Sequence, residues 1–365
     1  YGAVIVPILH EFKADQVHNI VDHSEAKLLF VGDVVWENLD ESAMPNLDGI
    51  ILVNDLSLLV SRTEKLTYAR ENLNALFGKK FPKNFRKEHV SYYKDSADEL
   101  LVLNYTSGTT SFSKGVMLPS KAIWSNIQFG HEKLGKCLKA GDSIVSMLPM
   151  AHMYGLAFEF LYEFCYGCHI YFLTRMPSPK IILQAFAAVK PKLVIAVPLI
   201  IEKIIKKNVL PKLETPTMRF LMRVPLVNDK IKAKVREQLM NAFGGEFYQI
   251  IVGGAAFNQE IEAFLRSINF PYTVGYGMTE CAPIISYEDW TIFKGGSCGK
   301  AAPRMEVQLL SRDPQNIPGE IVTRGDNVML GYYKNEDATN EVIDADGWLH
   351  TGDLGVMDAE GNITI

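Results

Sequence analysis

Asn104-Tyr-Thr-Ser-Gly-Thr-Thr-Ser-Phe-Ser-Lys-Gly-Val-Met-Leu118 sets glycines, hydroxyls and one lysine between two apolar runs. Gly108 and Gly115 permit tight turns, so that free backbone N–H groups and the hydroxyls can donate to anionic oxygens. Lys114 adds a compact positive charge. The preceding run, Leu100–Leu103, is uninterrupted aliphatic, as in strands that are buried on both faces. The stretch predicts a phosphate-binding loop at a strand end in an α/β sheet.

A Walker A loop is the first alternative for this stretch. Lys114 follows Gly108 at the right spacing, but Ser113 replaces the second glycine and Gly115 replaces the magnesium-binding Ser or Thr. A polar surface turn is the other alternative for the stretch taken alone. Further glycine motifs downstream favour phosphate binding.

Composition predicts a soluble, cytoplasmic globular protein of two to three domains, with 365 residues, a net charge of −5 and 48% hydrophobic residues. The acidic balance argues against nucleic acid as a partner. The chain opens with Tyr1 rather than Met and has no signal-peptide pattern, so we expect a piece of a longer protein.

The most apolar window is Met153–Leu173. Glu159 and Glu163 would each cost about 2.5–3.5 kcal/mol at a bilayer centre, so the window predicts a buried helix followed by a strand. Within it, Cys165-Tyr-Gly-Cys168-His169 matches the c-type haem attachment pattern. We favour buried, reduced thiols over haem, and also over zinc, because no second C-x-x-C completes four ligands.

The chain alternates strand-like and helical windows, which predicts parallel sheets. Residues 54–98 interrupt this pattern as a charged, irregular region that contains the basic, Phe-bearing run Lys79–Lys87. A solvated loop is the favoured interpretation of that run, with a membrane-surface or nucleotide-phosphate contact as the alternative. The expected strands are 3–8, 27–31, 50–53, 144–148, 169–173, 193–197, 247–252, 306–310, 320–323, 348–351 and 363–365, and the helices 13–23, 120–126, 178–189, 199–207 and 227–243.

The expected fold class is α/β, with two wound, mostly parallel sheets flanked by helices and a small β-barrel-like subdomain. The predicted parts are 1–174, with the phosphate loop, 175–290, with two further glycine sites, and 291–365, the small β subdomain. The glycine sites are Gly253–Ala256 and Gly275–Glu280, each after a strand, where ligands bind in open α/β sheets. His152 follows another strand end and is a candidate pocket residue or a core histidine.

Taken together, these motifs resemble the adenylate-forming superfamily, and within it the AMP-forming acyl-CoA synthetases. The resemblance covers essentially the whole chain, which is similar to the large domain of the acetyl-CoA synthetase-like fold. The motifs occur in family order: the loop Tyr105–Gly115, the acyl-site segment Leu148–Gly155, Gly253–Ala256, Gly275–Glu280, Glu320–Tyr333 and Thr351–Gly355. The loop departs from the family pattern at Ser111 and Ser113.

The resemblance implies that a carboxylate attacks ATP to give acyl-AMP and pyrophosphate, after which coenzyme A displaces AMP. It implies Mg²⁺ bound to Glu280, Thr279 at the α-phosphate with a loop hydroxyl such as Thr106, Tyr276 stacked on adenine and Asp353 on the ribose. The expected catalytic residues are Lys114, Thr279, Glu280 and His152. The expected nucleotide-binding residues are Thr106, Ser107, Gly108, Thr109, Thr110, Ser111, Lys114, Gly254, Ala255, Ala256, Tyr276, Gly277, Thr279 and Asp353.

The acyl-site segment carries no acidic residue that would pair with a substrate amine. This implies an acid that has no charged group besides its carboxylate. We favour a medium- to long-chain fatty acid, since burial contributes about 0.8 kcal/mol per CH₂. The expected lining is Met153, Tyr154, Leu156, Phe158, Ile284 and Ile285. The alternatives are an acyl- or aryl-AMP ligase that delivers to a carrier protein and a non-catalytic nucleotide-binding relative.

The family resemblance also implies a small C-terminal domain beyond Thr351-Gly-Asp353, the T-G-D motif. That domain brings a second lysine to the α-phosphate, and this chain ends at Ile365. We therefore expect residues 1–365 alone to bind nucleotide and to make no thioester.

Overall fold

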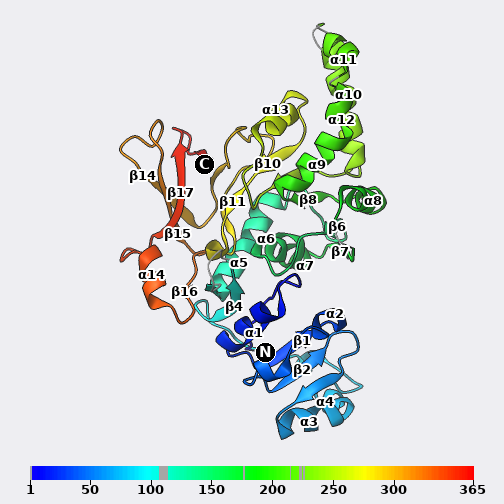
Figure 1. The fold of residues 1–365 in the computed structure, drawn as a ribbon, viewed down its shortest axis with the longest axis vertical. Helices are drawn as coiled ribbons and strands as arrows, with labels where there is room; N and C mark the ends of the chain where they lie inside the picture. The colour runs from blue at the N-terminus through cyan, green and yellow to red at the C-terminus, as the bar shows by residue number, and fades with distance from the viewer. Residues whose placement is uncertain (1, 107–113, 176, 214, 222–223, 225–226) are drawn as a thin grey trace. The chain divides into compact units, whose positions relative to one another are not determined.

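The computed structural model describes residues 2–106, 114–175, 177–213, 215–221, 224 and 227–365 (Figure 1). Contacts within the chain divide it into two compact units, Tyr1–Ser120 and Lys121–Ile365. Both units combine helices with sheets, as the predicted fold class requires. The division into 1–174, 175–290 and 291–365 stays a prediction.

The first unit contains a three-stranded sheet covered by an amphipathic helix. The second strand of that sheet pairs parallel with the first and antiparallel with the third. The helix buries Val17, Ile20 and Val21, which share one face because they are spaced by three and four residues. The elements are α1 (Ala14–His23), β1 (Leu28–Val31), α2 (Asp33–Trp36), η1 (Glu41–Ala43), β2 (Gly49–Leu52), β3 (Leu58–Ser61), α3 (Glu64–Glu71), α4 (Leu73–Lys80), η2 (Lys87–His89), β4 (Leu100–Tyr105) and β5 (Gly115–Pro119).

The predicted phosphate loop connects two antiparallel strands. β4 pairs with β5 so that Tyr105 lies opposite Gly115, and the Thr106 N–H donates to the Lys114 carbonyl at 3.2 Å. The predicted strand is confirmed, but the loop belongs to a hairpin and does not end a parallel strand, because the apolar residues that follow Gly115 form a largely buried second strand. Ser107, Gly108, Thr109, Thr110 and Ser111 lie outside the described residues.

Two other predictions for this unit are wrong. Residues 3–8 form no strand: Ile5 makes a single bridge to Val102, and Pro7 has no N–H with which to continue a ladder. Residues 54–98 are less irregular than expected, since they contain β3, α3 and α4. The overlooked signal is Thr63, whose hydroxyl accepts the Leu66 N–H and caps α3.

In the second unit, parallel strands precede an antiparallel sheet. β9 pairs parallel with both β8 and β10, and β6 with β7, as the alternating pattern predicts. The elements up to residue 287 are α5 (Ser120–Phe129), the π-helix η3 (Gly130–Leu134), β6 (Ser143–Ser146), α6 (Met153–Leu156), the π-helix η4 (Ala157–Leu161), α7 (Tyr162–Tyr166), β7 (His169–Phe172), α8 (Pro179–Val189), β8 (Leu193–Ala196), α9 (Pro198–Asn208), α10 (Leu210–Leu213), α11 (Pro216–Leu221), α12 (Val227–Ala242), β9 (Gln249–Val252), α13 (Gln259–Ser267), β10 (Tyr272–Val274), β11 (Tyr276–Gly277), η5 (Thr279–Cys281) and β12 (Ile284–Tyr287).

The C-terminal part of this unit is the predicted antiparallel β region. One sheet has the order β14-β15-β17-β18, with Ile321 and Ile363 fully buried in its core, and another has the order β11-β12-β13. In Figure 1, β11 lies between the parallel strands β8–β10 and the orange and red strands of the C-terminal sheet. The elements are β13 (Lys300–Ala301), β14 (Met305–Leu310), β15 (Gly319–Gly325), β16 (Gly331–Tyr332), α14 (Glu336–Val342), β17 (Leu349–Met357) and β18 (Ile363–Thr364).

The apolar window after Met153 forms helical turns and then β7, as predicted. None of the helices in the described part of the chain is long and apolar enough to cross a membrane. The expectation of buried thiols is wrong for the C-x-x-C pair, because Cys165, on α7, is exposed and Cys168, just after α7, is half-buried. Partial burial, with nearby Glu163, raises the pKa of Cys168 to about 11.

Two buried glutamates lie beneath the end of β6. Glu159 Oε2 accepts the N–H groups of Met147, at 2.8 Å, and Leu148, at 2.7 Å, and so fixes the backbone that leads into the acyl-site segment. Burial raises the pKa of Glu159 to about 8 although these hydrogen bonds lower it. Glu163 is also fully buried, and neither of its carboxyl oxygens has a hydrogen-bond partner among the described residues. Burial and the charge of Glu159 raise the pKa of Glu163 to about 8 as well.

These pKa shifts predict that Glu163→Gln stabilises the protein increasingly as pH rises. Between about pH 4.5 and 8 the folded chain keeps a proton on Glu163 that the unfolded chain has lost. The stabilisation that this proton adds to the free energy of unfolding is therefore complete below pH 4.5. It declines by about 1.4 kcal/mol per pH unit until pH 8. Melting temperatures of Glu163→Gln and the wild type at pH 5, 6, 7 and 8 measure the effect. The variant's melting temperature should exceed that of the wild type by more at each higher pH.

Glu237→Gln is the matched control, because Glu237 is an exposed glutamate on α12. It should change the melting temperature little and equally at every pH. A pH-independent difference for Glu163→Gln would contradict the raised pKa.

Candidate functional site

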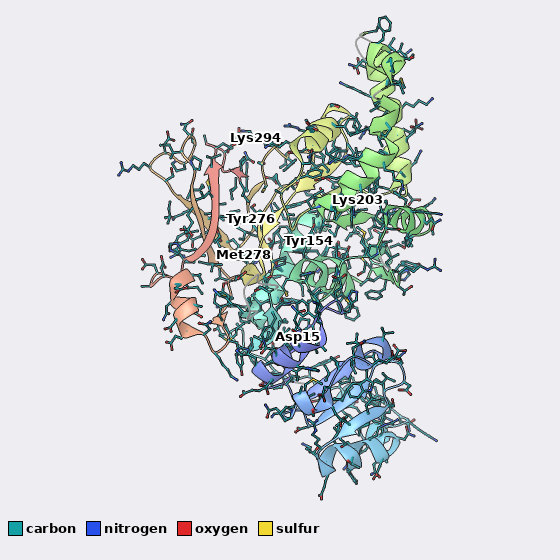
Figure 2. All side chains as sticks on the ribbon, viewed as in Figure 1. Asp15, Tyr154, Lys203, Tyr276, Met278 and Lys294 are labelled. Carbon is teal, nitrogen blue, oxygen red and sulfur yellow. The ribbon has the colours of Figure 1, made fainter. Side chains whose placement is uncertain are left out.

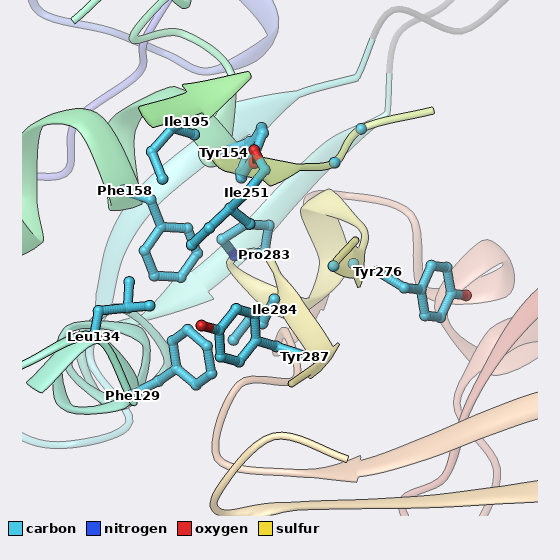
Figure 3. A pocket seen from close by; sticks show the side chains of 14 residues that line it. Phe129, Leu134, Tyr154, Phe158, Ile195, Ile251, Tyr276, Pro283, Ile284 and Tyr287 are labelled. Carbon is cyan, nitrogen blue, oxygen red and sulfur yellow. Dashed lines mark hydrogen bonds between the residues drawn. The ribbon is translucent and has the colours of Figure 1, made fainter. Parts of the chain in front are cut away.

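An apolar cavity of about 50 Å³ lies in the second unit. Figure 3 shows it enclosed by aromatic and aliphatic side chains from α5, η3, α6, η4 and strands β8, β9 and β12. Of the expected lining, Tyr154, Phe158 and Ile284 are present, whereas Met153, Leu156 and Ile285 are not part of it. The lining residues are Phe129, Leu134, Tyr154, Phe158, Ile195, Ile251, Gly253, Gly254, Gly275, Tyr276, Gly277, Pro283, Ile284 and Tyr287.

Aromatic side chains pack edge to face around one end of this cavity. The ring of Phe129 lies 5.6 Å from Phe158 and 5.3 Å from Tyr287, between centroids. Such contacts hold large side chains in defined positions. The Tyr154 hydroxyl donates to the Ile251 carbonyl at 3.0 Å, and burial raises its pKa, so that it stays a protonated donor. The cavity wall is therefore both apolar and fixed.

A larger, more polar cleft of about 610 Å³ adjoins the apolar cavity. It brings together most of the predicted nucleotide-binding residues of this unit, namely Gly254, Ala255, Ala256, Tyr276, Gly277 and Asp353. Its wall also includes Gln259, Glu262 and Arg266 from α13, which the sequence did not single out. These three follow no recognisable motif, and only the docking of α13 beside β10 places them in the cleft.

The two cavities share a boundary formed by Gly254 and Gly275–Gly277. Gly254 adopts a φ of +84°, a region that other residues rarely enter. At Gly277 a Cβ would lie 2.1 Å from the Pro283 carbonyl oxygen, so no side chain fits there. At these glycines, backbone without side chains therefore lies where the apolar cavity and the polar cleft meet.

Tyr276 links this boundary to the C-terminal sheet. Its ring projects away from the aromatic cluster in Figure 3, and its hydroxyl donates to Asp353 Oδ2 at 2.7 Å. Burial raises the pKa of Tyr276, which keeps this hydroxyl a donor. Tyr276 and Tyr154, both labelled in Figure 2, are lining residues of the apolar cavity.

Neighbouring side chains fix the T-G-D turn that carries Asp353. Glu320, on β15, accepts the Gly352 N–H at 3.1 Å and contacts His350 Nδ1 at 3.0 Å. The Thr351 hydroxyl donates to the Ile321 carbonyl at 2.7 Å and accepts the Asp353 N–H at 3.1 Å. The two family motifs that contain Glu320 and Asp353 thus form one hydrogen-bonded unit.

Glu280, on η5, is a buried carboxylate whose Oε1 accepts the Tyr332 hydroxyl at 2.8 Å. Burial and the charge of Glu280 raise the pKa of Tyr332, so that the tyrosine is the donor. No group of three or more His, Cys, Asp or Glu side chains arranged to hold a metal occurs within the described ranges. A metal at Glu280 would need further oxygen ligands from a bound substrate, as Mg²⁺ commonly takes from phosphates.

The other predicted residues are less closely tied to the two cavities. Lys114 is exposed at the start of β5, and Thr106 is half-buried at the end of β4, both in the first unit. Thr279 is half-buried next to Glu280. His152 is exposed before α6 and is not among the lining residues of either cavity. The nucleotide-binding role of Thr106 and the catalytic roles of Lys114, Thr279 and His152 stay predictions.

Comparison with known proteins identifies the family of this chain. Residues 1–333 match the family described as AMP-binding enzyme. The long-chain-fatty-acid–CoA ligase 1 of Cavia porcellus is 26% identical over 397 residues, covering 100% of this chain and 55% of that protein. The 4-coumarate–CoA ligase 1 of Oryza sativa subsp. japonica is 31% identical over 291 residues, covering 73% of this chain and 45% of that protein. The chain thus spans about half the length of these relatives.

Solved structures share the fold. The crystal structure of the anthranilate CoA ligase AuaEII in complex with anthranoyl-AMP superposes with a TM-score of 0.74 at 17% identity, covering 100% of this chain and 62% of that chain. The fold class predicted from the motifs is thereby confirmed. The family match, the shared fold and the ordered motifs agree: this chain belongs to the adenylate-forming family of AMP-binding enzymes.

Proposed function

We propose that the intact protein activates an apolar carboxylic acid with ATP, forms acyl-AMP and pyrophosphate, and transfers the acyl group to coenzyme A. The observation that carries this proposal is the common boundary of the apolar cavity and the polar cleft at Gly254 and Gly275–Gly277. Adenylation requires a carboxylate and an α-phosphate to meet while the rest of each substrate stays in its own environment. A glycine-lined boundary permits that approach.

The nucleotide occupies the polar cleft in this proposal. Gly254, Ala255 and Ala256 lie against the adenine, and Tyr276 stacks on it. Asp353, oriented by the Tyr276 hydroxyl, accepts the ribose hydroxyls. These roles suit the residue types, since a carboxylate accepts from two neighbouring hydroxyls at once.

Positive charge and oriented donors assist the phosphate chemistry. Lys114 and the loop that precedes it, with Thr106 and Thr279, stabilise charge that develops on the phosphates. Glu280 holds Mg²⁺ together with phosphate oxygens, and the Tyr332 hydroxyl keeps its carboxylate in place. Bound Mg²⁺ would supply Lewis-acid polarisation of the phosphates. His152 acts at the carboxylate of the acid.

A fatty acid is the proposed substrate, because the cavity is lined almost entirely by apolar side chains and carries no charged group. Relatives along the whole chain include long-chain fatty acid–CoA ligases. An aromatic acid is the second candidate. It is favoured by the small cavity volume of about 50 Å³ and by five aromatic residues in the lining, Phe129, Tyr154, Phe158, Tyr276 and Tyr287.

Pyrophosphate release from the intact protein tests the function. ATP and Mg²⁺ would be supplied with hexanoate, decanoate, palmitate, 4-coumarate or benzoate, each with and without coenzyme A. Pyrophosphate release with at least one acid, and thioester only when coenzyme A is present, supports the proposal. Release without thioester would identify a ligase that delivers to another acceptor, and no release with any acid would identify a non-catalytic relative.

Asp353→Ala should weaken binding of a non-hydrolysable acyl-AMP analogue by about 10- to 100-fold, as loss of a charged hydrogen-bond acceptor does. Tyr276→Phe keeps the ring and loses the hydroxyl that donates to Asp353, so we expect a smaller loss, about two- to tenfold. Calorimetry measures both. Asp346→Ala, at an exposed aspartate of the neighbouring turn, is the control and should bind normally. Equal affinity for all four proteins would remove Asp353 from the ribose site.

Glu280→Gln and Lys114→Ala should each slow acyl-AMP formation by about 10²–10³, since each removes preorganised charge. Tyr332→Phe keeps the carboxylate of Glu280 and should cost only about tenfold. ATP–pyrophosphate exchange measures the rates, with Lys94→Ala as an exposed-lysine control for Lys114. A near wild-type rate for either principal variant would exclude that residue from catalysis.

Leu134→Ala should move the preference toward longer acids, because Leu134 is a fully buried part of the cavity wall. Space for about two more CH₂ groups should raise the kcat/KM ratio of decanoate to hexanoate by about tenfold. Leu138→Ala is the matched control, since Leu138 is equally buried but outside the lining. Both variants lose stability by about 2–5 kcal/mol. An equal shift in preference for both, or none for Leu134→Ala, would place the acyl chain elsewhere.

A further inference from the structure

One surface of the first unit carries aromatic, aliphatic and basic side chains together, on α4 and the segment that follows it. Figure 1 labels α4 in this unit. We call this surface the α4 patch. All of its members are exposed, and none lines the apolar cavity or the polar cleft. They are Leu73, Leu76, Phe77, Phe81 and Phe85, with Lys79, Lys80, Lys83, Arg86 and Lys87.

The apolar members form one continuous surface. Leu73, Leu76 and Phe77 share a helix face through their spacing of three and four residues, and α4 buries none of its residues. The Phe81 ring lies 4.8 Å from Phe77 and 5.6 Å from Phe85, between centroids. The row continues to His89, 5.7 Å beyond Phe85. Contiguous exposed apolar groups of this kind mark interaction sites more often than scattered ones do.

The charge of the patch is of one sign. Residues 73–87 contain five basic side chains and no acidic one, in a chain whose net charge is −5. This concentration opposes the overall charge of the chain, so it does not reflect a generally basic protein. A partner with dense negative charge is complementary to it.

We infer that the α4 patch binds the surface of an anionic phospholipid bilayer. Phenylalanine and leucine side chains favour the headgroup boundary, where their rings and methyl groups leave water, while lysine and arginine extend toward the phosphates. Nucleic acid or an acidic protein would satisfy the basic residues, but neither accounts for a continuous row of exposed Phe and Leu among them. The inference rests on the patch alone and is independent of the proposed enzymatic activity.

Sedimentation with vesicles tests the inference on the intact protein. Vesicles of phosphatidylcholine with 30% phosphatidylglycerol are compared with pure phosphatidylcholine. We expect binding to the anionic vesicles that weakens as salt is raised, since exposed charges are screened. Lys79→Gln/Lys80→Gln/Lys83→Gln should reduce the partition coefficient by about fivefold per lysine. Phe77→Ser/Phe81→Ser should reduce it at least tenfold at unchanged charge.

Matched controls come from the second unit. Lys203→Gln/Lys206→Gln/Lys207→Gln removes three exposed lysines of α9, of which Lys203 is labelled in Figure 2. Phe164→Ser removes a phenylalanine that is 67% exposed, against 61% for Phe77. Neither control should reduce vesicle binding by more than twofold.

Four binding results would overturn the inference: no binding of the wild type to anionic vesicles, equal binding to neutral vesicles, an equal loss in the controls, or binding only to an added polyanion such as DNA or polyglutamate. Melting temperatures of the variants give an independent check. Substitutions on a solvent-exposed face leave them nearly unchanged. A drop of many degrees for Phe77→Ser/Phe81→Ser would mean that another part of the protein covers the patch, which also overturns the inference.

Discussion

The hydrogen bond from the Tyr276 hydroxyl to Asp353 joins the two halves of the candidate nucleotide cleft. Tyr276 lies on β11, in the antiparallel sheet β11-β12-β13 that follows the parallel strands. Asp353 lies on β17, in the other antiparallel sheet, 77 residues further along the chain. Within its own sheet, the T-G-D turn is held by Glu320 and by the Thr351 hydroxyl. The cleft therefore depends on a long-range contact between two antiparallel sheets.

Much of the second unit could be predicted from the sequence because local patterns of apolar and polar residues indicate its helices and strands. Continuous aliphatic runs such as those of β8 and β9 are buried along their whole length, and they alternate with helices at predictable spacing. The first unit was less predictable. The apolar run at 3–8 looked like a strand, but it forms a single bridge at Ile5. The β4–β5 hairpin could not be separated from a parallel strand end, because burial on both faces gives the same aliphatic pattern in either case.

Some residues of the candidate site could be predicted from the sequence and others could not. Motif residues with special backbone requirements, Gly254 and Gly277 above all, could be found from the sequence because only glycine satisfies them. Phe129, Leu134 and Tyr287, which line the apolar cavity, could not, since as isolated core residues they resemble any others. Tyr332 was part of a motif, yet nothing in its spacing indicated that its hydroxyl holds Glu280. Sequence patterns reveal what the backbone needs, whereas side-chain partners depend on the tertiary fold.

The charge of the buried glutamates near the acyl-site segment, Leu148–Gly155, bears on how anionic substrates could bind there. In the proposed reaction a carboxylic acid and a polyphosphate, both anions, meet near this segment, so fixed negative charge there would oppose their binding. Glu159 lies directly beneath the end of β6, and Glu163 follows one helical turn later, but burial raises both pKa values to about 8. At neutral pH both side chains are therefore mostly uncharged. Glu159 still accepts the Met147 and Leu148 N–H groups, because a protonated carboxyl retains acceptor capacity. Burial thus lets a glutamate fix the backbone at the start of this segment without placing a full negative charge beneath it.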